Sequence, residues 1–94
     1  MIELTEKNFE ETKKGKVLID CYAGWCGVCK MIKPKIEELE YKTDYKFYGL
    51  DAEKNAVLAS MLNVSNLPTL ILFEDGKETL RGSFNVLAEL EGAK

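Results

Sequence analysis

The 94-residue sequence contains no histidine and only three cysteines, an odd and small number. Secreted disulfide frameworks carry their bridges in pairs and at higher density, so this composition argues against one. Structural zinc sites normally take four Cys or His ligands. Without histidine, only Cys21 and carboxylates are left to complete a site with Cys26 and Cys29. We therefore expect no bound metal in a single chain, whereas a cluster bridged between two chains stays open.

Excess positive charge and long apolar runs are also absent. Thirteen Lys and Arg face sixteen Asp and Glu, and the lysines are spread along the chain, so nucleic acid is not an expected partner. No apolar run approaches the length of a signal-peptide core or a membrane span, and we expect a cytoplasmic protein away from the membrane. No low-complexity tract or Gly/Ser linker divides the chain, so residues 1–94 are expected to form one domain.

The apolar pattern predicts alternating strands and helices. Strand-like runs occupy residues 2–4, 17–22, 45–50, 70–73 and 78–81. Helical patterns begin near residues 5, 26 and 51, and a last one covers residues 85–91. Pro34 is expected to kink the second helix without ending it. Parallel strands need helical crossovers and hairpins do not. The first three strands should therefore be parallel and the last two antiparallel around Asp75-Gly76, in an α/β fold of order βαβαβαββα.

Two cysteines, Cys26 and Cys29, stand between a buried strand and a helix. The unpaired N–H groups and the dipole of a helix N-terminus favour negative charge, so Cys26 is expected to have a lowered pKa and to be an exposed nucleophile. Cys29 lies about one helical turn further on and faces the same side. It can attack a mixed disulfide formed on Cys26. This arrangement predicts thiol–disulfide exchange.

Residues 17–34, VLIDCYAGWCGVCKMIKP, closely resemble thioredoxins, and the resemblance continues through Leu67-Pro68-Thr69, Asp75-Gly76 and Gly82. It implies the thioredoxin fold, a central mixed sheet of about five strands flanked by helices. It also implies a protein-disulfide reductase whose redox-active disulfide joins Cys26 and Cys29, with no other bound cofactor. The implied partners are disulfide-containing protein substrates and a thioredoxin reductase, which uses NADPH. We expect a monomer.

The resemblance also assigns further site residues. Pro68 is expected to be a cis-proline beside the cysteines, and the Leu67 backbone to pair with an extended substrate segment. The implied substrate surface is shallow and apolar, and its residues are Trp25, Gly27, Val28, Leu67, Pro68 and Gly82. Asp20 lies within an apolar strand, where burial should raise its pKa. We expect it to act as the general base for Cys29, and the alternative is a structural, hydrogen-bonded aspartate.

Three positions depart from the common thioredoxin pattern. Val28 replaces the frequent proline between the cysteines, which leaves the redox potential open. Phe47 replaces a frequent lysine near the buried carboxylate, so Asp20 is expected to titrate higher than in lysine-bearing relatives. Cys21 replaces an aromatic residue, and we expect a buried, inert thiol on the face opposite Asp20. Lys30 and Lys33 could add positive potential near Cys26, but solvated helix lysines are the favoured interpretation.

Other functions compete with that of a protein-disulfide reductase. A disulfide oxidase or isomerase stays open because of Val28, and a glutaredoxin-like variant shares the fold. The WCGxC context and Asp20 look more like thioredoxin than glutaredoxin. A redox-inert binding module is less favoured, since both cysteines and Asp20 are present.

Overall fold

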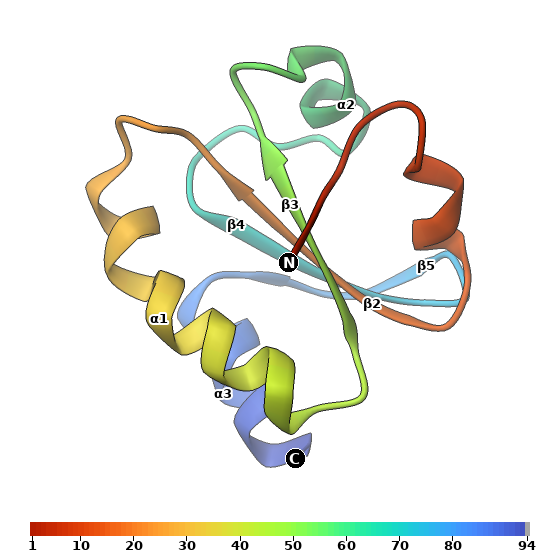
Figure 1. Ribbon diagram of the computed structural model, residues 1–94, viewed down its shortest axis with the longest axis vertical. Helices are drawn as coiled ribbons and strands as arrows, with labels where there is room; N and C mark the ends of the chain where they lie inside the picture. Colours follow the sequence, from red (N-terminus) through yellow and green to blue (C-terminus); the bar gives the residue numbers. More distant parts are fainter. Residues whose placement is uncertain (94) are drawn as a thin grey trace.

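The structure is a computed structural model that describes residues 1–93 (Figure 1). Within these residues the strands are β1 (Ile2–Glu3), β2 (Lys16–Tyr22), β3 (Lys46–Asp51), β4 (Thr69–Glu74) and β5 (Lys77–Gly82). The helices are η1 (Phe9–Lys13), α1 (Gly27–Lys42), α2 (Ala56–Met61) and α3 (Phe84–Ala93). This order confirms the predicted βαβαβαββα arrangement and the α/β class.

A mixed sheet of order β1-β3-β2-β4-β5 forms the centre of the molecule. Strand β3 runs parallel to both β1 and β2, whereas β4 is antiparallel to β2 and β5 is antiparallel to β4, as predicted. Asp75 and Gly76 both have positive φ at the tip of the β4–β5 hairpin. Two positive φ values in a row match the right-handed twist of the strands they join. The central strand, β2, leads directly to the cysteines.

Helices cover both faces of the sheet, and each face has its own apolar core. Buried residues of α1 and α3, such as Ile36 and Leu90, pack with Leu18 on one face. On the other face, Leu58 of α2 and Phe9 of η1 pack with Ile19. Figure 1 shows α1 and α3 together on one side of the sheet. Because β2 is buried on both faces, its sequence is nearly continuous in apolar side chains.

Two helices differ in detail from the sequence prediction. The first is the short 3₁₀ helix η1, which Asn8 precedes without capping it. The Asn8 side chain instead accepts the Thr5 N–H and donates to the Glu3 carbonyl. The apolar side chains predicted for α2 do not all enter the core, since Val57 is exposed and Leu58 is buried. Helix α1 continues through Pro34.

Over residues 1–93, each helix is too short or too polar to cross a membrane.

Candidate functional site

Cys26 and Cys29 form a disulfide at the point where β2 gives way to α1. Their Cα atoms are 5.3 Å apart, within the usual range for a disulfide. Cys26 is the N-cap residue of α1, and its Sγ accepts a hydrogen bond from the Cys29 N–H at 3.1 Å. A sulfur in this position receives one of the helix's otherwise unpaired N–H groups and the positive end of its dipole. The predicted placement of Cys26 is confirmed.

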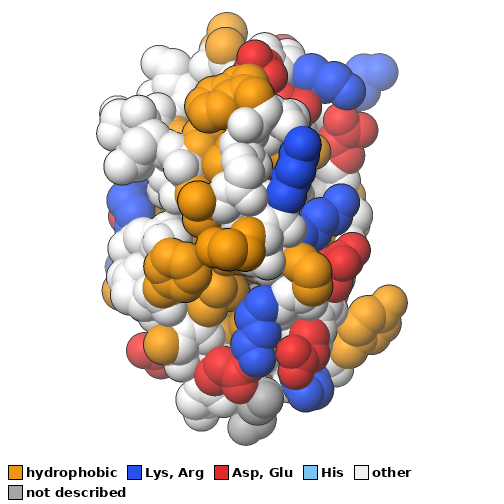
Figure 2. Space-filling model, turned by 90° about the vertical axis from the view of Figure 1, so that its left-hand side faces the viewer, with side chains coloured by type: hydrophobic (Ala, Val, Ile, Leu, Met, Phe, Trp, Pro, Cys, Tyr) orange, Lys and Arg blue, Asp and Glu red, His pale blue; other side chains and the backbone are white. Residues whose placement is uncertain are grey.

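The expectation of an exposed Cys26 is wrong for the disulfide form. In the disulfide-bonded state Cys26 is 5% exposed and Cys29 is 7% exposed. Their neighbours in sequence are open instead: Trp25 is 68% exposed, and Val28 is also exposed. Figure 2 shows hydrophobic side chains gathered on the face where β2 runs into α1, bordered by Lys and Arg side chains. The surface beside the disulfide is therefore apolar.

Asp20 is a carboxylate in the middle of the sheet. It lies on β2 opposite Gly49 of β3 and Leu70 of β4, and it is 5% exposed. Burial raises its pKa from the ordinary 3.8 to about 6, against a smaller lowering by the positive charge of Lys33. Its Oδ1 has no hydrogen-bond partner among residues 1–93, so the structure does not favour a hydrogen-bonded structural aspartate. A carboxyl group with this pKa exchanges protons near neutral pH.

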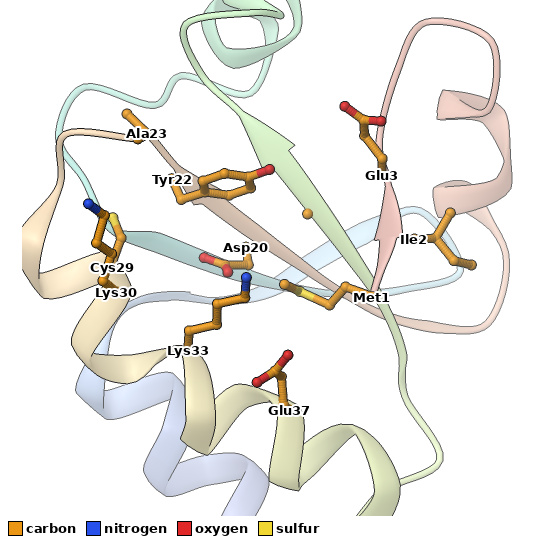
Figure 3. A pocket seen from close by; sticks show the side chains of 12 residues that line it. Met1, Ile2, Glu3, Asp20, Tyr22, Ala23, Cys29, Lys30, Lys33 and Glu37 are labelled. Atoms are coloured by element: carbon orange, nitrogen blue, oxygen red, sulfur yellow. The ribbon is translucent and has the colours of Figure 1, made fainter.

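A pocket of about 570 Å³ lies between the buried carboxylate and the second cysteine (Figure 3). Asp20 and Cys29 both line it, with Lys30 and Lys33 from the same helix. Figure 3 shows the Lys33 side chain extending from α1 toward Asp20. Lys33, which the sequence suggested to be a solvated helix lysine, therefore lies close to Asp20, and its spacing alone did not predict this proximity. The available signal was the spacing, since Lys33 lies four residues after Cys29 and therefore on the same face of the helix.

The loop before β4 brings Pro68 close to Gly82. The Leu67–Pro68 bond is cis, as predicted, and both Pro68 and Gly82 line a pocket of about 230 Å³. This hollow is polar, because the loop and β5 supply most of its wall from Asn63, Ser65, Asn66 and Arg81. Leu67 packs against the core under α2.

Gly82 has φ +153°, and a Cβ there would lie 2.0 Å from Oδ1 of Asn85. That Oδ1 accepts the Ser83 N–H at 2.8 Å, so the Asn85 side chain is fixed at the start of α3. Only glycine fits this position without displacing it. The backbone of Gly82 therefore stays open beside Pro68.

Cys21 takes no part in this arrangement. It is buried on the α2 face of the sheet, opposite Asp20, as predicted. Burial, with a further contribution from the Asp20 charge, raises the pKa of its thiol to about 12. Such a thiol is protonated and poorly nucleophilic at neutral pH. In the described part of the chain, no three Cys, Asp or Glu residues gather as a metal site.

Comparisons with known proteins agree with this geometry. Residues 1–90 match the family model described as Thioredoxin. The thioredoxin of Staphylococcus haemolyticus is 40% identical over 80 residues, which cover 82% of this chain and 77% of that protein. Protein disulfide-isomerase 1 of Caenorhabditis elegans is 42% identical over 86 residues, which cover 84% of this chain and 18% of that protein.

A solved structure with the same fold is mitochondrial thioredoxin 3 of Saccharomyces cerevisiae in its oxidised form, with a TM-score of 0.86 and 30% identity. The match covers 99% of this chain and 92% of that one. The fold is therefore the thioredoxin fold predicted from the sequence. With a cysteine pair bonded at the start of α1, the chain belongs to the thioredoxin family of thiol–disulfide oxidoreductases.

Proposed function

We propose that the protein reduces disulfides of protein substrates through Cys26 and Cys29. The observation that carries this proposal is the capping geometry: Sγ of Cys26 accepts the Cys29 N–H at the helix N-terminus. In the reduced protein the same N–H group and dipole stabilise a Cys26 thiolate. The thiolate attacks a substrate disulfide, a Cys26–substrate bond forms, and one substrate sulfur leaves as a thiolate.

Cys29 completes the reaction. Its thiol loses a proton, and the resulting thiolate attacks Sγ of Cys26, which forms the Cys26–Cys29 disulfide and releases the second substrate sulfur. Two electrons have then passed from the protein to the substrate. The two cysteines are 5.3 Å apart at Cα and bonded in the oxidised form, so this step needs no rearrangement of the helix.

Asp20 is proposed to take the proton from Cys29, directly or through water. Both residues line the same pocket, and the pKa of Asp20, about 6, leaves most of this carboxyl ionised at pH 7. An ionised carboxylate can accept the proton, and a pKa this close to neutrality also lets it return the proton afterwards. Cys21 is on the other face of the sheet and has no role in the cycle.

The substrate surface is proposed to comprise the six residues assigned from the resemblance: Trp25, Gly27, Val28, Leu67, Pro68 and Gly82. Exposed Trp25 and Val28 offer apolar contacts, and the backbone beside cis-Pro68 can pair with an extended segment. The polar hollow between Pro68 and Gly82 adds hydrogen-bonding groups to this surface. A flexible or partly unfolded substrate strand that carries a disulfide fits such a site best.

The remaining assignments are proposed from the sequence and from family membership. We propose a monomer in which residues 1–94 work as one domain in the cytoplasm. There it carries electrons in redox homeostasis, and a thioredoxin reductase supplied with NADPH restores the dithiol. A disulfide isomerase is the second candidate, because Val28 replaces the frequent proline and the relative from C. elegans is named a protein disulfide-isomerase.

The equilibrium reduction potential separates these candidates. The protein is equilibrated in graded glutathione buffers, its free thiols are trapped by alkylation, and the dithiol fraction is read by mass. We expect a potential near −270 mV, roughly that of thioredoxins, whereas a value above about −200 mV contradicts a reductase and favours an isomerase or oxidase. The variant Cys21→Ala serves as the control, since it should give the same potential with one fewer thiol.

A further inference from the structure

The surroundings of Asp20 contain charges from several elements. Across the sheet its neighbours on β3 and β4 are Gly49 and Leu70, which carry no charge. The charged and ionisable groups of the residues that line the pocket with it are the ammonium group of Met1, Glu3 of β1, Tyr22 of β2, and Lys30, Lys33 and Glu37 of α1, with Cys29 joining them when the disulfide is reduced. Three of them are cations, and the Met1 ammonium group is already paired with Glu40 at 3.1 Å. The charge balance at Asp20 therefore depends on which of the two lysines reaches it.

Lys33 is the better placed of the two. Figure 3 shows its ammonium group beside the Asp20 carboxylate, whereas Lys30 lies next to Cys29 at the other end of the pocket. The charge of Lys33 lowers the pKa of Asp20, and no other charge has a resolved effect on that group. Glu37 lies one turn further along α1, on the far side of Lys33 from Cys29. It belongs to the same pocket wall.

Strand β3 offers no cation on this face. Phe47, which pairs with Leu18 of β2, is buried in the core between the sheet and α1. Lys33 instead approaches from the helix and remains exposed to solvent. Its position four residues after Cys29 ties the charge to the same helix that carries the resolving sulfur.

We propose that Lys33 is the counter-charge of the Asp20 carboxylate, supplied by α1 in place of a cation on β3. This inference rests on the role proposed above for Asp20 and makes Lys33 a positioning residue for the proton step. Lys33 is not itself a proton acceptor in this state, because an ammonium group has three donors and no acceptor. Its effect is to favour the ionised carboxylate that accepts the Cys29 proton.

The test is a carboxyl-carbon NMR titration of Asp20 in the oxidised protein and in three lysine variants. In Lys33→Met the Asp20 pKa is expected to rise by about half a unit or more, because the neighbouring cation is gone. Lys33→Arg keeps the charge and should restore the wild-type value. Lys30→Met is the matched control, since it removes the same charge from the same pocket and should move the pKa by less than half as much. These lysines are exposed, so the fold should tolerate all three substitutions.

An unmoved Asp20 pKa in Lys33→Met, or equal shifts in Lys33→Met and Lys30→Met, overturns the counter-charge. The rate at which Cys29 resolves a mixed disulfide, measured against pH, then separates the two proposals. If Lys33→Met raises the Asp20 pKa and moves the rate profile to higher pH by the same amount, both the counter-charge and the proton-transfer role are supported. If the Asp20 pKa rises but the rate profile does not move along the pH axis, the counter-charge is supported and the proton-transfer role of Asp20 is overturned.

Discussion

Replacing Cys29 by Ser is expected to stop the cycle after its first step and to leave the protein covalently bound to its substrate. Cys26 still caps α1 and still attacks, but the serine hydroxyl is not ionised at neutral pH and cannot displace the substrate sulfur. Incubation of the reduced variant with insulin should give a mixed disulfide that is visible by mass under non-reducing conditions. Turnover should fall at least about a thousandfold.

Cys26→Ser is the matched control for this experiment. It removes the nucleophile and leaves Cys29, which is 7% exposed and sits inside the first turn of α1. We expect neither adduct nor turnover from it. A Cys29→Ser variant that releases reduced insulin at the wild-type rate, or an adduct that forms through Cys29, would show that the order of attack is wrong.

Replacing Asp20 by Asn is expected to stabilise the oxidised protein at pH 7 by up to about 3 kcal/mol. The pKa of Asp20 is raised from 3.8 to about 6, so between these values the folded protein keeps a proton that the unfolded chain has lost. The free energy of unfolding therefore falls by about 1.4 kcal/mol per pH unit as pH rises through that window. Above the window the loss is complete. An amide has no charge to bury and avoids this loss.

Urea unfolding at pH 7 and at pH 3.5 measures the effect. The stabilisation of Asp20→Asn should be present at pH 7 and largely gone at pH 3.5, where the wild-type Asp20 carboxyl is protonated in the folded protein and mostly protonated in the unfolded chain. Asp44→Asn is the control. It removes a carboxylate whose ion pair with Lys16, at 3.7 Å, is on the surface, and it should change stability by less than about 1 kcal/mol. Equal stability of wild type and Asp20→Asn at pH 7 contradicts a costly buried carboxylate.

The same substitution should slow the resolving step. Without a base beside Cys29, its proton must leave to solvent, and we expect a loss of at least about tenfold in the rate at pH 7. The combination of higher stability and lower rate distinguishes a catalytic carboxylate from a structural one, because losing a structural group lowers both. An unchanged rate removes Asp20 from the proposed mechanism.

Much of the fold could be predicted because local patterns and topology agree. The apolar run in β2 predicted a buried central strand, and Asp75-Gly76 predicted the hairpin, since each depends on residues close in sequence. The position of Cys26 at a helix start followed in the same way from its place between two elements. The cis bond at Pro68 was predicted through the family resemblance, because no local pattern specifies it.

What could not be predicted depends on contacts between distant segments. The polar wall beside Gly82 comes from a loop about twenty residues away, which the sequence alone does not place there. The approach of Lys33 to Asp20 needs the angle between α1 and the sheet. The burial of Cys26, which is 5% exposed when bonded to Cys29, is a property of the folded surroundings and not of the local sequence. The spacing of residues in the sequence shows which side chains share a face of a helix or strand, but it does not show which other segment packs against that face.

A single-turnover reaction between reduced protein and insulin is the most direct measurement of whether Cys26 and Cys29 act as a two-electron donor. Free thiols are alkylated at intervals and assigned to residues by mass. We predict one new Cys26–Cys29 disulfide for each insulin disulfide reduced, with Cys21 still a free thiol throughout. If insulin is reduced while Cys26 and Cys29 both remain alkylatable, or if it is not reduced at all, the proposed reaction is wrong.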